Sequence, residues 1–235
     1  MITVEVAQRS GETKPSRTRA ISHNLNGQRL GRKGRDTRER IITAAQKLLA
    51  GPRDIPLTLS AVAREASLGM TSLYVYFNDL TELLLAMLEP TMAEAEDSYV
   101  SKLRTRWPDA TLATQCLDFV IAFHGFWDRH SRLLHLRNTM ADSQDERMAQ
   151  HRVGAATPVI ELIVEQMGQD GRALGTPPFG MATVLYAGIE RIITVATDVD
   201  MQSLLQGNFL QNIPHYLQAE ARLLELGIRD YRLAP

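Results

Sequence analysis

Residues 58–77 read TLSAVAREASLGMTSLYVYF, and their pattern predicts two short helices joined by a tight turn. Thr58 is a good N-cap for the first helix, because its hydroxyl can accept a bond from a free N–H group of the first turn. Four apolar residues then recur at helical spacing: Leu59, Val62, Ala63 and Ala66. Residues 67–70 form the turn region, and a second short helical segment follows at 71–77. The stretch therefore predicts a helix-turn-helix unit.

The second helix of such a unit lies in the major groove of DNA, so its outward face must bond phosphates and touch base edges. We expect Leu68 and Leu73 to face inward. The side chains available on the outward face are Met70, Thr71, Ser72, Tyr74, Val75 and Tyr76. In the alternative interpretation Tyr74, Tyr76 and Phe77 only form a small core, and the pattern by itself leaves both open.

The flanks of this unit also have helical patterns. Apolar residues at helical spacing predict a helix from residue 36, which Gly51 and Pro52 end. Asp79 followed by Glu82 resembles a capping box and predicts the start of the next helix. Further helices are expected near 80–105, 110–129, 131–140, 145–169, 178–198, 201–212 and 214–228, with a kink or break at Pro90. No segment alternates as a strand would, so the predicted fold class is all-α.

The stretch resembles the N-terminal domain of the TetR (tetracycline-repressor-like) family of transcriptional regulators. Residues 73–77, Leu-Tyr-Val-Tyr-Phe, match the family's Leu-Tyr-x-His/Tyr-Phe signature, and the resemblance spans about residues 36–84. It implies an all-helical homodimer that binds a palindromic operator. The implied organisation is a helix-turn-helix DNA-binding domain at 36–82 and a ligand-binding and dimerisation domain at 83–235, behind a flexible basic tail at 1–35.

The resemblance also implies roles for single residues. Thr58 would cap the second helix and touch a phosphate, and Tyr74 and Tyr76 would bond phosphate oxygens. The sequence of the operator would be read mainly by Met70, Thr71, Ser72 and Val75. This chain departs from the family at three positions: Ser67 replaces a turn glycine, Gly69 a capping serine, and Leu80 a lysine that contacts phosphate.

The charges of the chain are unevenly distributed. The totals nearly cancel, 26 Lys and Arg against 27 Asp and Glu, which excludes a uniformly basic protein. Residues 1–80 carry 13 basic and 7 acidic residues, a net +6, and residues 81–235 carry 13 and 20, a net −7. The positive charge of residues 1–80 therefore favours an anionic partner. Arg32, Lys33 and Arg35 resemble a minor-groove arm; the alternative is a solvated leader that touches nothing specific.

Other features narrow the class of protein. A single cysteine, Cys116, excludes a disulfide scaffold and indicates a reducing compartment. The apolar runs are shorter than the roughly 18 residues of a membrane span, and no signal peptide is visible, so we expect a cytoplasmic protein. Histidines 124, 130 and 135 are not spaced as metal ligands, and no nucleophile–base pair or cofactor motif is present. We therefore expect no metal, no cofactor and no enzymatic activity, and we interpret the polar run at 137–152 as a helix junction tied by ion pairs.

Residues 112–129 are apolar almost all round, which is typical of a helix in the middle of its domain. Family architecture makes this helix the wall of an effector pocket, although plain core packing is the alternative for each of its residues. The candidate lining residues are Phe119, Phe123, His124 and Trp127, with Met140, Met167, Met181, Leu185 and Tyr186 as weaker candidates. Such a lining favours an apolar or aromatic effector.

The last helices are expected to form the dimer. The residues predicted for that interface are Ile189, Ile192, Ile193, Leu217 and Leu224. The predicted function is a transcriptional repressor that binds double-stranded DNA as a homodimer and is released by a small molecule. Two alternatives stay open: a regulator of the same architecture without a small-molecule inducer, working as an activator or under a protein partner, and a helical ligand-binding protein or enzyme.

Overall fold

The computed structural model describes residues 31–52, 55–168 and 177–233, with backbone alone for 205–210 and 233. These residues contain helices and connecting turns and no strand, which confirms the all-α prediction. The helices are α1 (Arg32–Ala50), α2 (Leu59–Glu65), α3 (Met70–Tyr74), α4 (Leu80–Ala95), the π-helical turn η1 (Glu96–Val100), α5 (Ser101–Leu103), α6 (Leu112–Arg129), α7 (Ser131–Asp142), α8 (Glu146–Met167), α9 (Pro178–Thr197) and α10 (Val199–Leu233).

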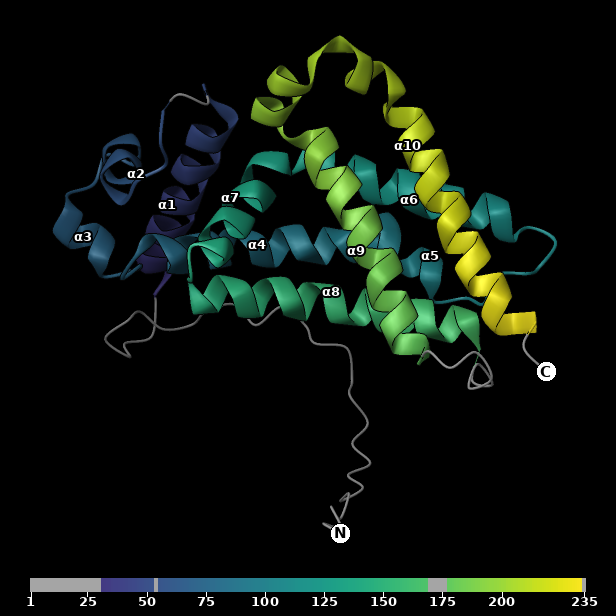
Figure 1. The fold of residues 1–235 in the computed structure, drawn as a ribbon. Helices are drawn as coiled ribbons and strands as arrows, with labels where there is room; N and C mark the ends of the chain where they lie inside the picture. The colour runs from purple at the N-terminus through teal and green to yellow at the C-terminus, as the bar shows by residue number, and fades with distance from the viewer. Residues whose placement is uncertain (1–30, 53–54, 169–176, 234–235) are drawn as a thin grey trace, which may run out of the picture.

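Helices α1, α2 and α3 form a small unit at one end of the molecule, which we call the head (Figure 1). Its core consists of side chains that are at most 1% exposed: Ile41, Ala45, Val62, Leu73 and Phe77. Phe77 follows α3 directly, so the aromatic end of the signature stretch closes this core. Tyr74, by contrast, is 48% exposed. The alternative in which Tyr74, Tyr76 and Phe77 together form a core therefore holds for Phe77 and fails for Tyr74.

Helix α1 begins at Arg32, before the predicted start at residue 36. Gly31 is its N-cap, and the backbone N–H of Arg35 donates to the Gly31 carbonyl at 3.1 Å. The first turns of α1 carry mostly charged side chains, whereas the apolar periodicity that marks the helix in the sequence starts at Ile41. The prediction of a flexible tail through residue 35 is therefore wrong for residues 32–35, and residues 1–30 lie outside the described part of the chain.

Helices α4 to α10 form the larger unit, which we call the body (Figure 1). Helix α6 lies in its middle and buries Cys116, Phe119, Val120 and Phe123 at 1% exposure or less. Burial raises the pKa of the Cys116 thiol to about 12, which fits the prediction of an inert core cysteine. Helix α10 packs on α9 and α6, and α8 packs between α7 and α9. The outer pair α9 and α10 therefore closes one side of the body.

Prolines interrupt the helices less than the sequence predicts. Helix α4 continues past Pro90 to Ala95, and a π-helical turn follows where the sequence predicts an uninterrupted helix. The predicted break at Pro214 is wrong, because α10 is a single helix that contains this proline. Its ribbon changes direction before it descends beside α9 (Figure 1), as expected for a helix with an internal proline. Buried residues beyond Pro214, such as Leu217 and Leu224, hold the rest of α10 on the body.

Candidate functional site

The turn between α2 and α3 orients the second helix of the head. Thr58 caps α2, since its Oγ1 accepts a bond from the Ala61 N–H at 3.2 Å, as the sequence predicts. At the other end of α2, the Leu68 N–H donates to the Ala63 carbonyl at 2.8 Å, and the Ser67 N–H to the Arg64 carbonyl at 3.1 Å. This pair of bonds is a Schellman motif. The motif needs a left-handed residue after the helix, and Ser67 supplies it with φ at 52°.

Helix α3 presents a polar outer surface above a buried anchor. Leu73 is completely buried, and Phe77 is 1% exposed. Three of the predicted DNA-contacting residues, Thr71, Ser72 and Tyr74, are exposed, while Met70, Val75 and Tyr76 are half-buried. Gly69 occupies the N-cap position of α3 and offers no side-chain cap. Exposed hydroxyl groups therefore gather at the start of α3, where the second helix of a helix-turn-helix unit meets DNA.

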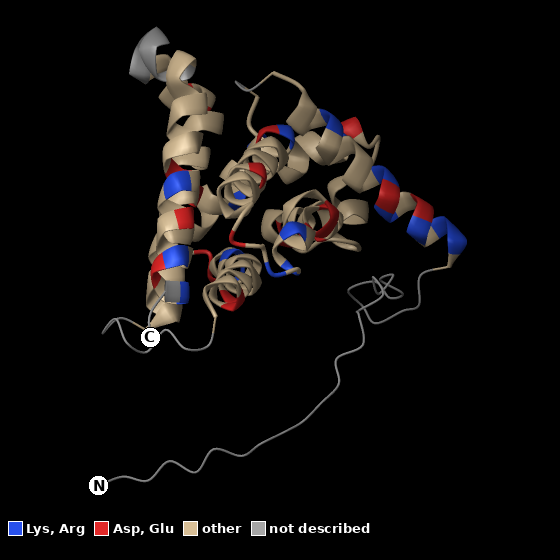
Figure 2. Cartoon of the chain, turned by 90° about the vertical axis from the view of Figure 1, so that its right-hand side faces the viewer, with Lys and Arg blue, Asp and Glu red and all other residues tan. Residues whose placement is uncertain are grey.

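Basic side chains cluster on the first turns of α1. Arg32, Lys33 and Arg35 are exposed there, on the helix that leads out of the grey N-terminal trace (Figure 2). Arg38, further along α1, is half-buried and lies over the Phe77 ring at 5.0 Å from its centroid. Burial lowers the pKa of Arg38. The basic end of α1 is thus joined to the aromatic end of the signature stretch by a cation–π contact.

Specific polar contacts fix the start of α4, the first helix of the body after the head. Asp79 caps α4 by accepting from the Glu82 N–H, which confirms the predicted helix start, and Glu82 accepts from the N–H of Asn78, one residue before the N-cap of a standard capping box, both at 2.8 Å. The other Asp79 oxygen accepts from Arg147 of α8 at 2.8 Å. Beside it, the hydroxyl of Thr81 donates to Asp145, the N-cap of α8, at 2.5 Å. The start of α4 is therefore attached to the start of α8.

A single arginine of the body also holds the end of α1. The Nη1 of Arg132 donates to the carbonyls of Leu48 at 3.2 Å, Leu49 at 2.9 Å and Gly51 at 2.7 Å. Its Nη2 donates to the Ile55 carbonyl at 3.0 Å. The carbonyls at the end of a helix lack intrahelical partners and carry partial negative charge, so a guanidinium there satisfies and stabilises them. This role of Arg132 has no local signal in the sequence, because its acceptors are backbone groups 77 to 84 residues away.

The aromatic residues predicted to line an effector pocket pack against one another in the body. Phe123 lies 4.5 Å from Tyr99, 6.0 Å from Phe119 and 5.9 Å from Tyr186, as measured between ring centroids. Trp127 is 2% exposed. Tyr99, on the π-helical turn, is central to this cluster and was not identified from the sequence. The cavities described below are lined by other residues, and the predicted lining of an effector pocket by the aromatic residues stays a prediction.

The remaining residues predicted to line an effector pocket differ in their exposure. His124 is half-buried, and burial lowers the pKa of its imidazole, so the ring is neutral near pH 7. Met167 is completely buried, whereas Met140, Met181 and Leu185 are partly buried. Arg137 is 4% exposed and lies over the Trp127 ring at 5.6 Å. Burial lowers the pKa of Arg137.

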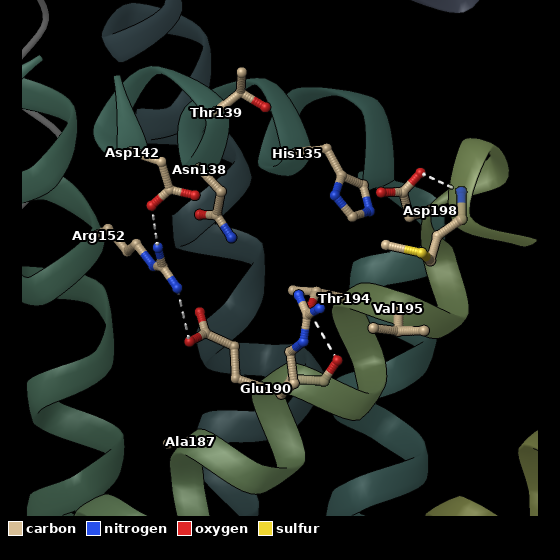
Figure 3. Close-up of a pocket in the computed structure, with 12 residues that line it drawn as sticks. His135, Asn138, Thr139, Asp142, Arg152, Ala187, Glu190, Thr194, Val195 and Asp198 are labelled. Atoms are coloured by element: carbon tan, nitrogen blue, oxygen red, sulfur yellow. Dashed lines mark hydrogen bonds and ion pairs between the residues drawn. The ribbon is translucent and has the colours of Figure 1, made fainter. Parts of the chain in front are cut away.

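A polar cavity of about 300 Å³ lies between α7, α8 and α9 (Figure 3). Arg152 of α8 crosses it and pairs with Asp142 at 3.2 Å and with Glu190 of α9 at 3.4 Å. His135 and Asn138 of α7 also line it. These ion pairs, together with that between Arg147 and Asp79, confirm the interpretation of the polar run as a tied helix junction.

The predicted dimer residues need correction. Ile189, Ile193, Leu217 and Leu224 are at most 6% exposed within the single chain, so they pack on the body's own core. Ile192 is partly exposed. The amphipathic pattern locates a buried face but does not distinguish a core of the same chain from an interface. The large apolar side chains exposed on these two helices, within the described residues, include Phe179, Val184, Leu204, Leu223 and Leu226.

Helix α9 is long and apolar. Within the described part of the chain it is the one helix whose length and mean hydropathy, 1.4 over 18 residues, would suit a membrane span. Only 28% of that window is buried. Its inward residues, such as Ile189 and Ile193, pack in the core of the body. The core helix of a soluble protein passes the same length and hydropathy test.

Comparison with known proteins supports the fold. No protein-family model matches the chain, and no curated protein matches it. The chain is similar to the crystal structure of NalD, the secondary repressor of the MexAB-OprM multidrug efflux pump in Pseudomonas aeruginosa. The two structures share 18% sequence identity and a TM-score of 0.51, over 80% of this chain and 96% of NalD. The chain therefore has the fold of a known repressor, with a helix-turn-helix head and a helical body.

Proposed function

We propose that this protein is a transcriptional repressor that binds a palindromic DNA operator as a homodimer and releases it when a small molecule binds to the body. The observation that carries the proposal is the head itself. A Schellman turn orients α3 so that Leu73 is buried while Thr71, Ser72 and Tyr74 are exposed. The NalD-like fold supports the same assignment. We propose further that the protein is cytoplasmic and has no catalytic activity.

In this proposal the residues of the head have two kinds of role. Thr71 and Ser72 read base edges together with Met70 and Val75, because they lie at the start of the helix that enters the major groove. Tyr74 and Tyr76 donate their hydroxyls to phosphates, and so does Thr58 while its oxygen caps α2. Arg32, Lys33 and Arg35 of α1 add positive charge near the duplex, which increases affinity for any sequence and makes binding depend on salt.

The proposed dimer uses the exposed sides of α9 and α10. Val184 of α9 is 68% exposed, and Leu223 and Leu226 of α10 are 52% and 45% exposed. Pairing two such helices from each protomer makes a four-helix interface that buries these apolar side chains. The dimer would place its two α3 helices about 34 to 36 Å apart, the spacing of successive major grooves.

The dimer is tested by changing Val184 and Leu223 together to Glu. We expect the variant to sediment as a monomer and to lose operator binding, because two charges per protomer would be buried in the interface. Val153→Glu is the matched control, since Val153 is an equally apolar side chain that is 63% exposed on α8 and not on α9 or α10. A dimeric Val184→Glu, Leu223→Glu variant, or a monomeric control, would contradict the proposed interface.

In the proposed regulation, the small-molecule effector binds to the body. We propose an effector with apolar or aromatic surface, in keeping with the aromatic cluster around Phe123. An effector that binds better to one separation of the two heads shifts the population toward that separation, with a coupling of roughly 1 to 3 kcal/mol. The polar contacts of Arg132, Asp79 and Thr81 are the means by which a movement of the body would reach the head.

The DNA-binding proposal is tested by selection from a random duplex library with the purified full chain, followed by sequencing. We expect enrichment of a palindrome whose half-sites are one or more helical turns apart. Thr71→Ala combined with Tyr74→Ala should abolish enrichment while the circular dichroism spectrum stays helical. No enriched sequence with the folded wild-type chain would overturn the proposal.

A further inference from the structure

A second cavity lies between the head and the body. Its volume is about 470 Å³, and its walls come from the end of α1, the middle of α4 and the corner between α6 and α7. Leu49, Met87, Pro90 and Leu133 give it apolar surface, and Arg132 and Glu94 give it charge. Because both units contribute walls, the shape of this cavity depends on how the head sits on the body.

Arg132 has further donors at this cavity that are not used by the described residues. A guanidinium carries five N–H groups. Two of them, on Nη1, serve the carbonyls of Leu48, Leu49 and Gly51, and one on Nη2 serves Ile55. The Nε–H and the second Nη2–H have no acceptor among the described residues. Nε and Nη2 lie on the same edge of the guanidinium, and such an edge binds a carboxylate with two parallel bonds.

The charge of the lining favours an anion. Arg132 meets only neutral carbonyls among the described residues, and Arg129 donates to the hydroxyl of Ser98 at 2.7 Å. Glu94 contributes the one carboxylate of the lining, and it is already paired with His130 at 3.1 Å. Two arginines therefore face the cavity without a carboxylate partner of their own in the described part of the chain, beside a wall of apolar side chains.

We propose that this cavity between head and body is a binding site for a small amphipathic carboxylic acid. Its carboxylate pairs with the Nε and Nη2 edge of Arg132, and its apolar part packs between Leu49, Met87 and Pro90. The occupant bridges α1, α4 and α7. Its regulatory consequence rests on the proposed function: if the head binds DNA, an occupied cavity favours one position of the head, and DNA and acid affect each other's affinity reciprocally.

The site is tested by direct binding to the full chain without DNA, so that its outcome is independent of the proposed DNA binding. The probes are benzoate, 2-naphthoate and decanoate, each compared with its neutral primary amide by titration calorimetry. We expect at least one carboxylate to bind at least tenfold more tightly than its amide, because only the carboxylate can pair with the charged guanidinium.

Three variants localise the binding. Arg132→Gln should weaken the carboxylate at least tenfold, and Ala50→Phe should block the cavity while leaving Arg132 in place. Glu94→Gln should tighten binding several-fold, since it removes the negative charge from the lining. Arg104→Gln, which breaks an exposed ion pair elsewhere on the body, is the control and should change nothing. If no carboxylate is preferred over its amide, or if Ala50→Phe and Arg132→Gln bind as the wild type does, the proposed site is wrong.

Discussion

The head and the body are both helical, but different kinds of contact position their helices. In the head, several helix ends are determined by residues next to them: Thr58 caps α2 and Ser67 makes the turn, and Asp79 likewise caps α4 directly after the head. In the body, the decisive contacts join residues far apart in the chain, such as Phe123 with Tyr186 and Arg152 with Glu190. The presentation of α3 is therefore specified locally, whereas the shape of the body depends on long-range packing.

The largest expected effect is a loss of stability that stays local to one of the two units. Leu73→Ala in the head and Leu224→Ala in the body each remove a completely buried leucine and should each cost about 2 to 5 kcal/mol. Because the head has the smaller core, Leu73→Ala should melt it locally and abolish DNA binding, while α9 and α10 keep their protection from hydrogen exchange. Equal loss of protection in both units after Leu73→Ala would show that they do not differ in this way.

The next effect concerns the link between the two units. Arg132→Gln should destabilise the protein by about 2 kcal/mol, because it leaves the carbonyls at the end of α1 without their charged donor. Hydrogen exchange at the end of α1 should increase most. Arg129→Gln, which removes one bond to Ser98, is the neighbouring control and should change stability by less than about 0.5 kcal/mol. Similar effects from both variants would contradict a special role for Arg132.

A smaller effect of opposite sign is expected in the turn of the head. Ser67→Gly relieves a left-handed conformation that costs a side-chain-bearing residue roughly 1 kcal/mol, and part of the gain is lost to the greater freedom of glycine in the unfolded chain. We expect a net gain of about 0.5 kcal/mol and a slightly higher melting temperature, with DNA affinity unchanged. A destabilised Ser67→Gly variant would show that the serine side chain, and not its backbone angle, stabilises the turn.

The smallest effect is a dependence on pH. The bond from Thr81, with help from the Met148 N–H and Arg147, lowers the pKa of Asp145 below its ordinary value of 3.8. An acid group whose pKa is lower in the folded state stabilises the fold above the unfolded pKa and loses that contribution as the pH falls through the folded pKa. The melting temperature should therefore fall slightly below pH 4, and Asp145→Asn should flatten this fall. An unchanged acid profile in Asp145→Asn would exclude the contribution.

Much of the head could be predicted from the sequence, because its signals are local. The caps at Thr58 and Asp79 and the buried positions of Val62 and Leu73 follow from spacing alone. The start of α1 could not be predicted, since its first turns carry charged residues without apolar periodicity. These signals act within a few residues of the element that they control.

In the body, the positions of the helices along the sequence were predictable, but the way in which the helices pack on one another was less so. Apolar patterns indicated α6, α8 and α9 but did not show which faces pack within the chain, so Ile193 and Leu224, which were predicted for a dimer interface, are instead buried in the chain's own core. Pro214 indicated a break that long-range packing overrides. The role of Arg132 could not be predicted, since no local pattern relates an arginine to backbone carbonyls of another unit.

The central claim is that α3 of the head recognises a specific DNA sequence. It is tested most directly by fluorescence anisotropy with the selected palindrome and a shuffled duplex of equal length, at physiological salt. We expect the wild-type chain to prefer the palindrome by at least about 1,000-fold, and Thr71→Ala combined with Tyr74→Ala to remove this preference without unfolding the protein. Equal affinity of the folded wild-type chain for both duplexes would contradict the claim.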